Sequence, residues 1–354
     1  MAPVPVYADS ATYDYANVDY TPQLELIAMA DQLVAKINTA NANPNVVVTA
    51  LTLTNMFNNT GSPFNDSAYN LNGSGLALAN YFPAAAKTDM LNYFDSIGVY
   101  SQTGVGASEG VAGVDSSSQS HSKKYLLSPT GVFYSQVVKK TIMGAFAYQI
   151  GNVYLADSLN STMDTVKLKH YWDAAFGFFG VPVNFPASVS GLKYLGSYAN
   201  QVNAGLHCNT SIMNAFLEGR AAISNSGIAT MKAQANILIH TFDSLDAAAI
   251  VQEMHETNAN IEAGDAVAAY GTLSESLGFV RNLKYNTGAR VITDAQIQQL
   301  LELYDNTNPD NPNLYNFVGV NAGLTIGQIE AKTSAIAQLI GTIYGFNSTE
   351  LANL

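Results

Sequence analysis

The sequence of 354 residues predicts an all-α protein, and three observations support this fold class. Apolar residues recur at the spacing of amphipathic helices over most of the chain. Loops rich in Asn, Gly, Ser and Pro separate these stretches. Strand-like segments are few, and no β–α–β alternation or short fixed-period repeat is present. We therefore expect about nine helices, packed as bundles in two halves and preceded by an extended arm.

The elements of the N-terminal half follow from local composition. Residues 1–20 are rich in Pro, Tyr and Asp, which indicates an extended arm. A helix is expected over residues 22–40, because its apolar residues fall on one face and Asn41 to Pro44 then stop it. The β-branched stretch 46–53 fits either a short strand or a buried helix. The remaining segments are expected as a loop over 58–75, a helix over 76–97 interrupted near Pro83, and an irregular Gly- and Ser-rich stretch over 104–122.

The second half is expected to be helical as well. Ser128-Pro129 combines an N-cap residue with proline at the first helical position, so it predicts the start of a long apolar helix that ends near residue 155. The next helix, 165–179, is closed by Gly180 and Pro182. Further helices are expected over 200–224, 227–260, 265–283, 294–304 and 325–346. The predicted organisation is an arm over 1–20 and one all-α domain over 21–354, with a division into sub-bundles near residue 185 left open.

Composition excludes several classes of protein. Only 12% of the residues are charged and the net charge is −12. A typical globular protein has about 25% charged residues. Such a chain repels phosphate backbones, and its largest basic patches are the pairs Lys123-Lys124 and Lys139-Lys140, so we expect no nucleic-acid partner. The one cysteine, Cys208, excludes an intrachain disulfide and a cysteine zinc cluster.

The same composition bears on location. No apolar run reaches the roughly 18 residues of a transmembrane helix, and the N-terminus lacks a signal-peptide pattern. Scarce charge and abundant Asn and Thr favour an exported protein. The expected location is the cell envelope, in the periplasm or at the outer-membrane surface, or outside the cell.

Four ordered segments carry a family resemblance: TYDYANVDYTPQLELIAMADQL, SPTGVFYSQVVKKTIMGAFAYQIGNVYL, HYWDAAFGFFG and TLSESLGFVRNLKYN. Together they resemble an imelysin-related bacterial family of exported lipoproteins, the domain of unknown function numbered 4856. The resemblance implies an all-helical, imelysin-like double bundle and an envelope location, and it brings no established activity. Glycine-containing apolar helices in the second and fourth segments permit close helix packing.

The segment from His170 to Gly180 contains the only tryptophan of the chain. The helical period places Trp172, Phe176 and Phe179 on one stripe, which we expect to lie in the core. His170 and Asp173 lie at the edge of that stripe, three positions apart and therefore on one face.

His170 and Asp173 are candidate metal ligands. Better-described imelysin relatives carry a Gly-x-His-x-x-Glu signature and are associated with iron acquisition and with proposed metal-binding or metallopeptidase roles. Here Asp173 stands in place of the Glu, Leu168 in place of the Gly, and Ala174 where the family implies an acidic residue. Because a metal site needs three or four converging ligands, we add Glu275, an acid inside an apolar helix, as the third candidate.

The alternatives for these residues are structural. His170 can be a histidine at the edge of the core, and Glu275 can have a buried partner. Glu253, His255 and Glu256 are further possible donors but fit a solvated helix face.

Three functions remain open from the sequence. The first is an envelope or secreted binding protein that holds a small ligand, a divalent metal or iron, with His170, Asp173 and Glu275 converging. The second is a non-catalytic structural or assembly protein whose Tyr-rich arm packs along a neighbouring subunit to form a homo-oligomer. The third, a metallopeptidase, has the least support, because no third ligand or activated-water position is apparent. The sequence therefore favours a binding or structural protein over an enzyme.

Overall fold

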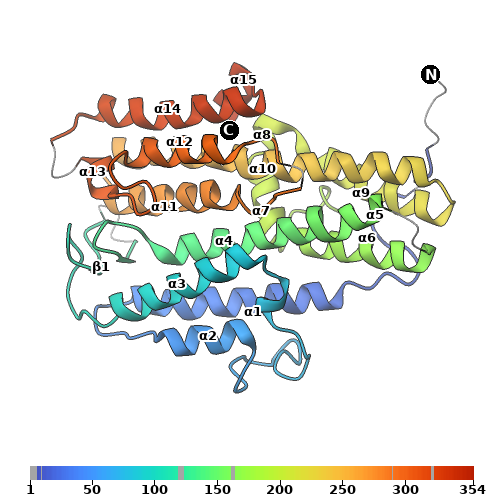
Figure 1. The fold of residues 1–354 in the computed structure, drawn as a ribbon, viewed down its shortest axis with the longest axis horizontal. Helices are drawn as coiled ribbons and strands as arrows, with labels where there is room; N and C mark the ends of the chain where they lie inside the picture. The colour runs from blue at the N-terminus through green and yellow to red at the C-terminus, as the bar shows by residue number, and fades with distance from the viewer. Residues whose placement is uncertain (1–5, 9, 119–122, 161–163, 289, 320–322) are drawn as a thin grey trace.

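The computed structural model describes all of residues 1–354 except 1–5, 9, 119–122, 161–163, 289 and 320–322. Helices dominate the described residues, and the named strands form one short antiparallel pair. The predicted all-α class is therefore confirmed. Figure 1 shows an elongated stack of roughly parallel helices, with the N-terminal helices on one side and the C-terminal helices on the other.

The first layer begins after the arm. Its elements are α1 (Thr21–Asn38), the 3₁₀ turn η1 (Thr39–Asn41), α2 (Ala50–Asn58), the 3₁₀ turn η2 (Leu78–Tyr81) and α3 (Ala84–Tyr100). The ambiguous stretch 46–53 enters a helix, because the Thr49 side chain accepts a hydrogen bond from the Thr52 amide and caps α2.

The middle of the chain contains the strands and the central helices. Its elements are β1 (Gly113–Asp115), β2 (Tyr125–Leu127), α4 (Tyr134–Tyr148), the π-helical segment η3 (Gln149–Leu155), α5 (Ala156–Leu159) and α6 (Thr165–Phe179). The predicted irregular stretch 104–122 therefore contains β1, and its residues 119–122 lie outside the described part. The predicted helix start at Ser128-Pro129 is wrong. Ser128 Oγ accepts from the Val132 amide in a turn, and Gly131 has a positive φ of 81°, so α4 begins only at Tyr134.

The C-terminal part contains the longest helix. Its elements are α7 (Tyr194–Gln201), α8 (Asn203–Leu206), α9 (Cys208–Ser224), α10 (Ile228–Glu262), α11 (Ala266–Asn282), α12 (Asp294–Tyr304), α13 (Leu314–Val318), α14 (Ile326–Tyr344) and α15 (Ser348–Asn353). The predicted helix 200–224 is interrupted because His207 adopts a left-handed φ of 51°. Together with the short α13 and α15, such breaks give the described residues more helices than the nine expected.

Close packing of α4 against α11 joins the two sides of the stack. Each helix presents a glycine at the contact. A Cβ on Gly144 would lie 2.6 Å from Cγ of Asn282, and one on Gly278 would lie 2.8 Å from Cβ of Lys140. These are the glycine-containing helices of the sequence prediction, and here their small residues face each other's helix.

Buried apolar side chains form a continuous core from Tyr13 to Leu354. Trp172, Phe176 and Phe179 are at most 1% exposed, which confirms their predicted place. The Trp172 indole donates to the carbonyl of Phe216 at 2.8 Å. Among the described residues, no helix is both long and apolar enough to cross a membrane.

The described part of the N-terminal arm packs on its own chain. The Tyr13 ring stacks on Phe176 with centroids 3.9 Å apart, and the Tyr15 hydroxyl donates to the carbonyl of Leu217 at 2.6 Å. The carboxylate of Glu218 accepts hydrogen bonds from the amides of residues 7 and 8. The described residues of the arm therefore pack against α6 and α9 of the same chain.

Candidate functional site

Asp173, a predicted metal ligand, is part of a buried ion pair. Its Oδ1 lies 2.7 Å from Nε of Arg220, and its Oδ2 accepts from Nη2 of the same guanidinium at 3.3 Å. The Tyr13 hydroxyl also donates to Oδ1, at 2.8 Å. Burial and the neighbouring Asp173 carboxylate raise the pKa of the Tyr13 phenol well above its usual value, so the phenol stays a donor. The donors around Asp173 thus come from the protein itself.

His170 lies on the same helix but faces solvent. Residues three apart on a helix differ by about 60° around its axis. The edge of the core runs between them, so Asp173 enters the core and His170 stays outside. Hydrogen bonds from Thr21 and, more weakly, the nearby His170 lower the pKa of Asp19.

The structure does not bring His170, Asp173 and Glu275 together. Among the residues it describes, no group of three or more His, Cys, Asp and Glu side chains is placed to hold a metal ion. The predicted convergence of these three residues is thus absent from the described part of the chain.

Glu275, the third predicted residue, lies in a buried polar cluster with Lys140, Tyr198 and Glu253, which we call the Lys140 cluster. Its four members come from α11, α4, α7 and α10. Glu275 Oε2 lies 2.5 Å from Lys140 Nζ and 2.5 Å from the Tyr198 hydroxyl. The same hydroxyl lies 2.5 Å from Nζ and 2.9 Å from Glu253 Oε1.

The pKa values of the two carboxyl groups in the Lys140 cluster shift in opposite directions. Burial, and then the negative charge of Glu275, raise the pKa of Glu253 well above its usual value. Burial alone would raise the pKa of Glu275 too, but the Lys140 ammonium outweighs it and the pKa falls below the usual value. The cluster therefore contains one Lys140–Glu275 ion pair, beside a Glu253 carboxyl and a Tyr198 phenol that burial shifts towards their protonated forms. The Lys140 ammonium lies against the Glu275 carboxylate, in the position that a bound metal cation would need.

Sequence reasoning missed part of this cluster. Glu253, assigned to a solvated face, is 2% exposed, and Lys140, read as half of a basic pair, is fully buried. The helical period contained a signal for Lys140, because Val137 and Gly144 lie three residues before and four residues after it on the same stripe. Tyr198 had no comparable signal.

Asp246 on α10 is another buried acid, and its Oδ1 has no hydrogen-bond partner among the described residues. Burial, and then the neighbouring Asp243, raise its pKa to about 8. The folded chain therefore holds a proton that the unfolded chain loses above a pKa of about 4. The contribution of Asp246 to the free energy of unfolding is fully present below that pH. It decreases as pH rises towards 8, by at most about 1.4 kcal/mol per pH unit.

Replacing this acid with its amide tests the argument. Asp246→Asn is expected to flatten the decline in unfolding free energy between about pH 4 and about pH 8. Urea unfolding across that range measures the effect, with the exposed Asp95→Asn as the matched control. Equal pH profiles for the parent and Asp246→Asn would show that Asp246 is ionised in the fold.

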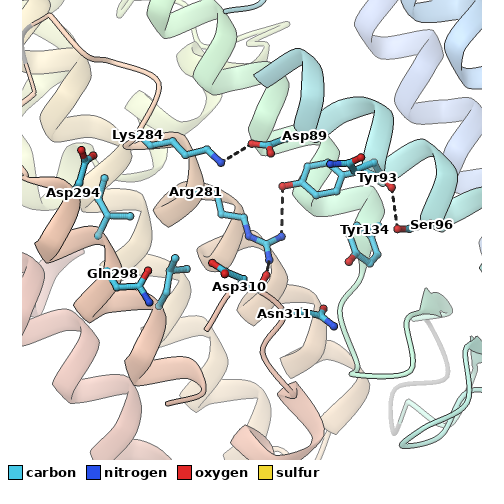
Figure 2. Close-up of a pocket in the computed structure, with 13 residues that line it drawn as sticks. Asp89, Tyr93, Ser96, Tyr134, Arg281, Lys284, Asp294, Gln298, Asp310 and Asn311 are labelled. Carbon is cyan, nitrogen blue, oxygen red and sulfur yellow. Dashed lines mark hydrogen bonds and ion pairs between the residues drawn. The ribbon is translucent and has the colours of Figure 1, made fainter. Parts of the chain in front are cut away.

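A polar pocket of about 480 Å³ opens between α3, α11, α12 and the loop before α13, and we call it the Arg281 pocket. It is lined by Asp89, Asn92, Tyr93, Ser96, Tyr134, Arg281, Lys284, Asp294, Ile297, Gln298, Leu301, Asp310 and Asn311. Figure 2 shows Arg281, on α11, and Lys284, in the turn just after α11, reaching towards α3.

The two cations of this pocket differ in their partners. Lys284 Nζ forms an ion pair with Asp89 at 2.7 Å. Arg281 instead donates to the carbonyl of Asp310 at 2.6 Å and to the Tyr93 hydroxyl at 3.5 Å (Figure 2). No carboxylate of the described residues lies within ion-pair distance of this guanidinium. Arg281 thus presents a positive charge that no described acid pairs with.

The chain is thus an all-α protein whose apolar core contains buried ion pairs and whose surface has a pocket lined largely by polar residues. The chain belongs to the family described as Domain of unknown function (DUF4856), whose model matches residues 12–347. No curated protein and no solved structure matches it.

Proposed function

We propose that this chain is a binding protein for a small zwitterionic molecule, such as an amino acid or a short peptide, held in the Arg281 pocket. The observation that carries the proposal is the guanidinium of Arg281, which lines the pocket and has no carboxylate partner among the described residues. Guanidinium groups bind carboxylates through two parallel hydrogen bonds. An anionic group of the ligand would take this position.

The rest of the pocket supports a ligand of mixed charge. The exposed Asp310 carboxylate can accept from a ligand ammonium group, and the amides of Asn92, Gln298 and Asn311 add neutral donors and acceptors. The cavity volume of about 480 Å³ lies within the range of about 300–1,000 Å³ for small-ligand pockets. A metal role has less support, since the described residues offer no ligand set.

Calorimetric titration with a panel of amino acids and dipeptides tests the proposal. We expect at least one member to bind, and Arg281→Lys to weaken it about tenfold, because lysine keeps the charge but loses the two-pronged geometry. Asp310→Asn should weaken the same ligand by removing the partner of its ammonium group. Lys36→Gln on α1, outside the pocket, is the control and should bind normally. A panel without a binder, or unchanged affinity in Arg281→Lys, would contradict the proposal.

The same proposal includes an imelysin-like affiliation and a location in the envelope or outside the cell. The ordered segments that resemble imelysin relatives and the low content of charge support both. Fractionating cells that express the full-length gene tests the location, and a purely cytoplasmic product would contradict it.

A further inference from the structure

The neighbouring lysines Lys139 and Lys140 lie in different environments. Successive residues on a helix point about 100° apart, so they do not share a face. Lys140 enters the core and pairs with Glu275. Lys139 is half-buried and lines a second pocket, of about 320 Å³, between α1, α4 and α7. This second cavity we call the Lys139 pocket.

Hydrogen-bond donors are abundant in the Lys139 pocket. Its polar lining comprises Asp31, Asn38, Ser135, Gln136, Lys139, Lys193, Tyr194, Ser197 and Tyr198. Its one carboxylate, from Asp31, is held by Lys193 at 2.7 Å. The two lysines and Asp31 therefore leave the lining with a net charge of +1, in a chain whose net charge is −12.

Lys139 provides that excess charge. No hydrogen bond or ion pair joins its ammonium to the described residues. Burial, and then the adjacent Lys140, lower the pKa of Lys139 and outweigh the opposing effect of the nearby carboxylates, so a further negative charge beside it would stabilise its charged form. An anion would supply this charge. Carboxylates and tetrahedral oxyanions both carry negative oxygens, but the number of surrounding donors favours the group with more oxygens.

We propose that the Lys139 pocket binds a phosphate group, with the Lys139 ammonium as its main electrostatic partner. Lys193 and the Ser197 hydroxyl lie in the same lining and can donate to other phosphate oxygens. This site is separate from the Arg281 pocket, with which it shares no lining residue. The volume admits inorganic phosphate as well as a small phosphomonoester.

Titration calorimetry of the full chain with inorganic phosphate and with glycerol phosphate tests this site. We expect saturable binding of at least one of the two, and at least tenfold weaker binding in Lys139→Met. Tighter binding of glycerol phosphate would identify a monoester as the ligand, and tighter binding of inorganic phosphate would identify the free ion. Ser197→Ala should weaken the same ligand several-fold.

The control variant is Lys167→Met, a lysine that is exposed on α6, and it should bind as the parent does. Because Lys139 has no partner among the described residues, Lys139→Met is expected to unfold at the parent's temperature. The unfolding temperature therefore distinguishes loss of the binding site from loss of the fold. Absence of saturable phosphate binding, or equal affinity in Lys139→Met and the parent, would overturn the proposal. Neither result depends on binding at the Arg281 pocket.

Discussion

Replacing Asp173 with alanine is expected to lower the free energy of unfolding by roughly 3–5 kcal/mol, because it leaves a buried guanidinium without its counter-ion. The side chains of Asp173 and Arg220 are each only 2% exposed, so water cannot replace the lost carboxylate. The Tyr13 hydroxyl also loses its acceptor. Urea unfolding of the parent and variant measures the difference.

A double-mutant cycle separates the ion pair from packing. Asp173→Leu combined with Arg220→Met removes both charges and keeps apolar volume, so it should cost less than the sum of the two single changes. Tyr13→Phe isolates the hydroxyl contribution and should cost about 1 kcal/mol. Additive effects of Asp173→Leu and Arg220→Met would contradict the coupling.

Local signals explain how far the sequence could predict α6. Its bounds, Thr165–Phe179, match the predicted helix because Asp164 caps the first turn and Gly180, with a φ of 74°, ends the helix. Its core stripe was also predictable from the period of Trp172 and its neighbours. Both properties depend only on residues within the segment.

The partners of the polar residues were not predictable in the same way. Arg220 is 47 residues from Asp173, and nothing in the spacing of His170 and Asp173 shows that one side chain enters the core. Metal-ligand spacing and a buried ion pair at the edge of a helix have the same local pattern. Only the packing of α9 against α6 distinguishes them.

The second large effect is expected at Lys140. Lys140→Met leaves the Glu275 carboxylate among Tyr198 and Glu253, and it should destabilise the fold by roughly 3–5 kcal/mol at neutral pH. The adjacent Lys139→Met is a close control, because it removes the same charge from the same helix without removing an ion pair of the described residues. Chemical unfolding should therefore distinguish two neighbouring lysines by several kcal/mol.

The cost of Lys140→Met should also depend on pH. In the parent, the ammonium holds the pKa of Glu275 below its usual value, so the pair stabilises the fold above the unfolded pKa of about 4 and loses this effect in acid. Without Lys140, burial would raise that pKa, and the variant would lose stability as pH rises. The difference between parent and variant should therefore be larger at about pH 8 than at about pH 5. Adding Glu275→Gln removes the carboxylate that pairs with Lys140 and should reduce this growth. A pH-independent cost would show that lost packing, rather than the ion pair, explains the effect of Lys140→Met.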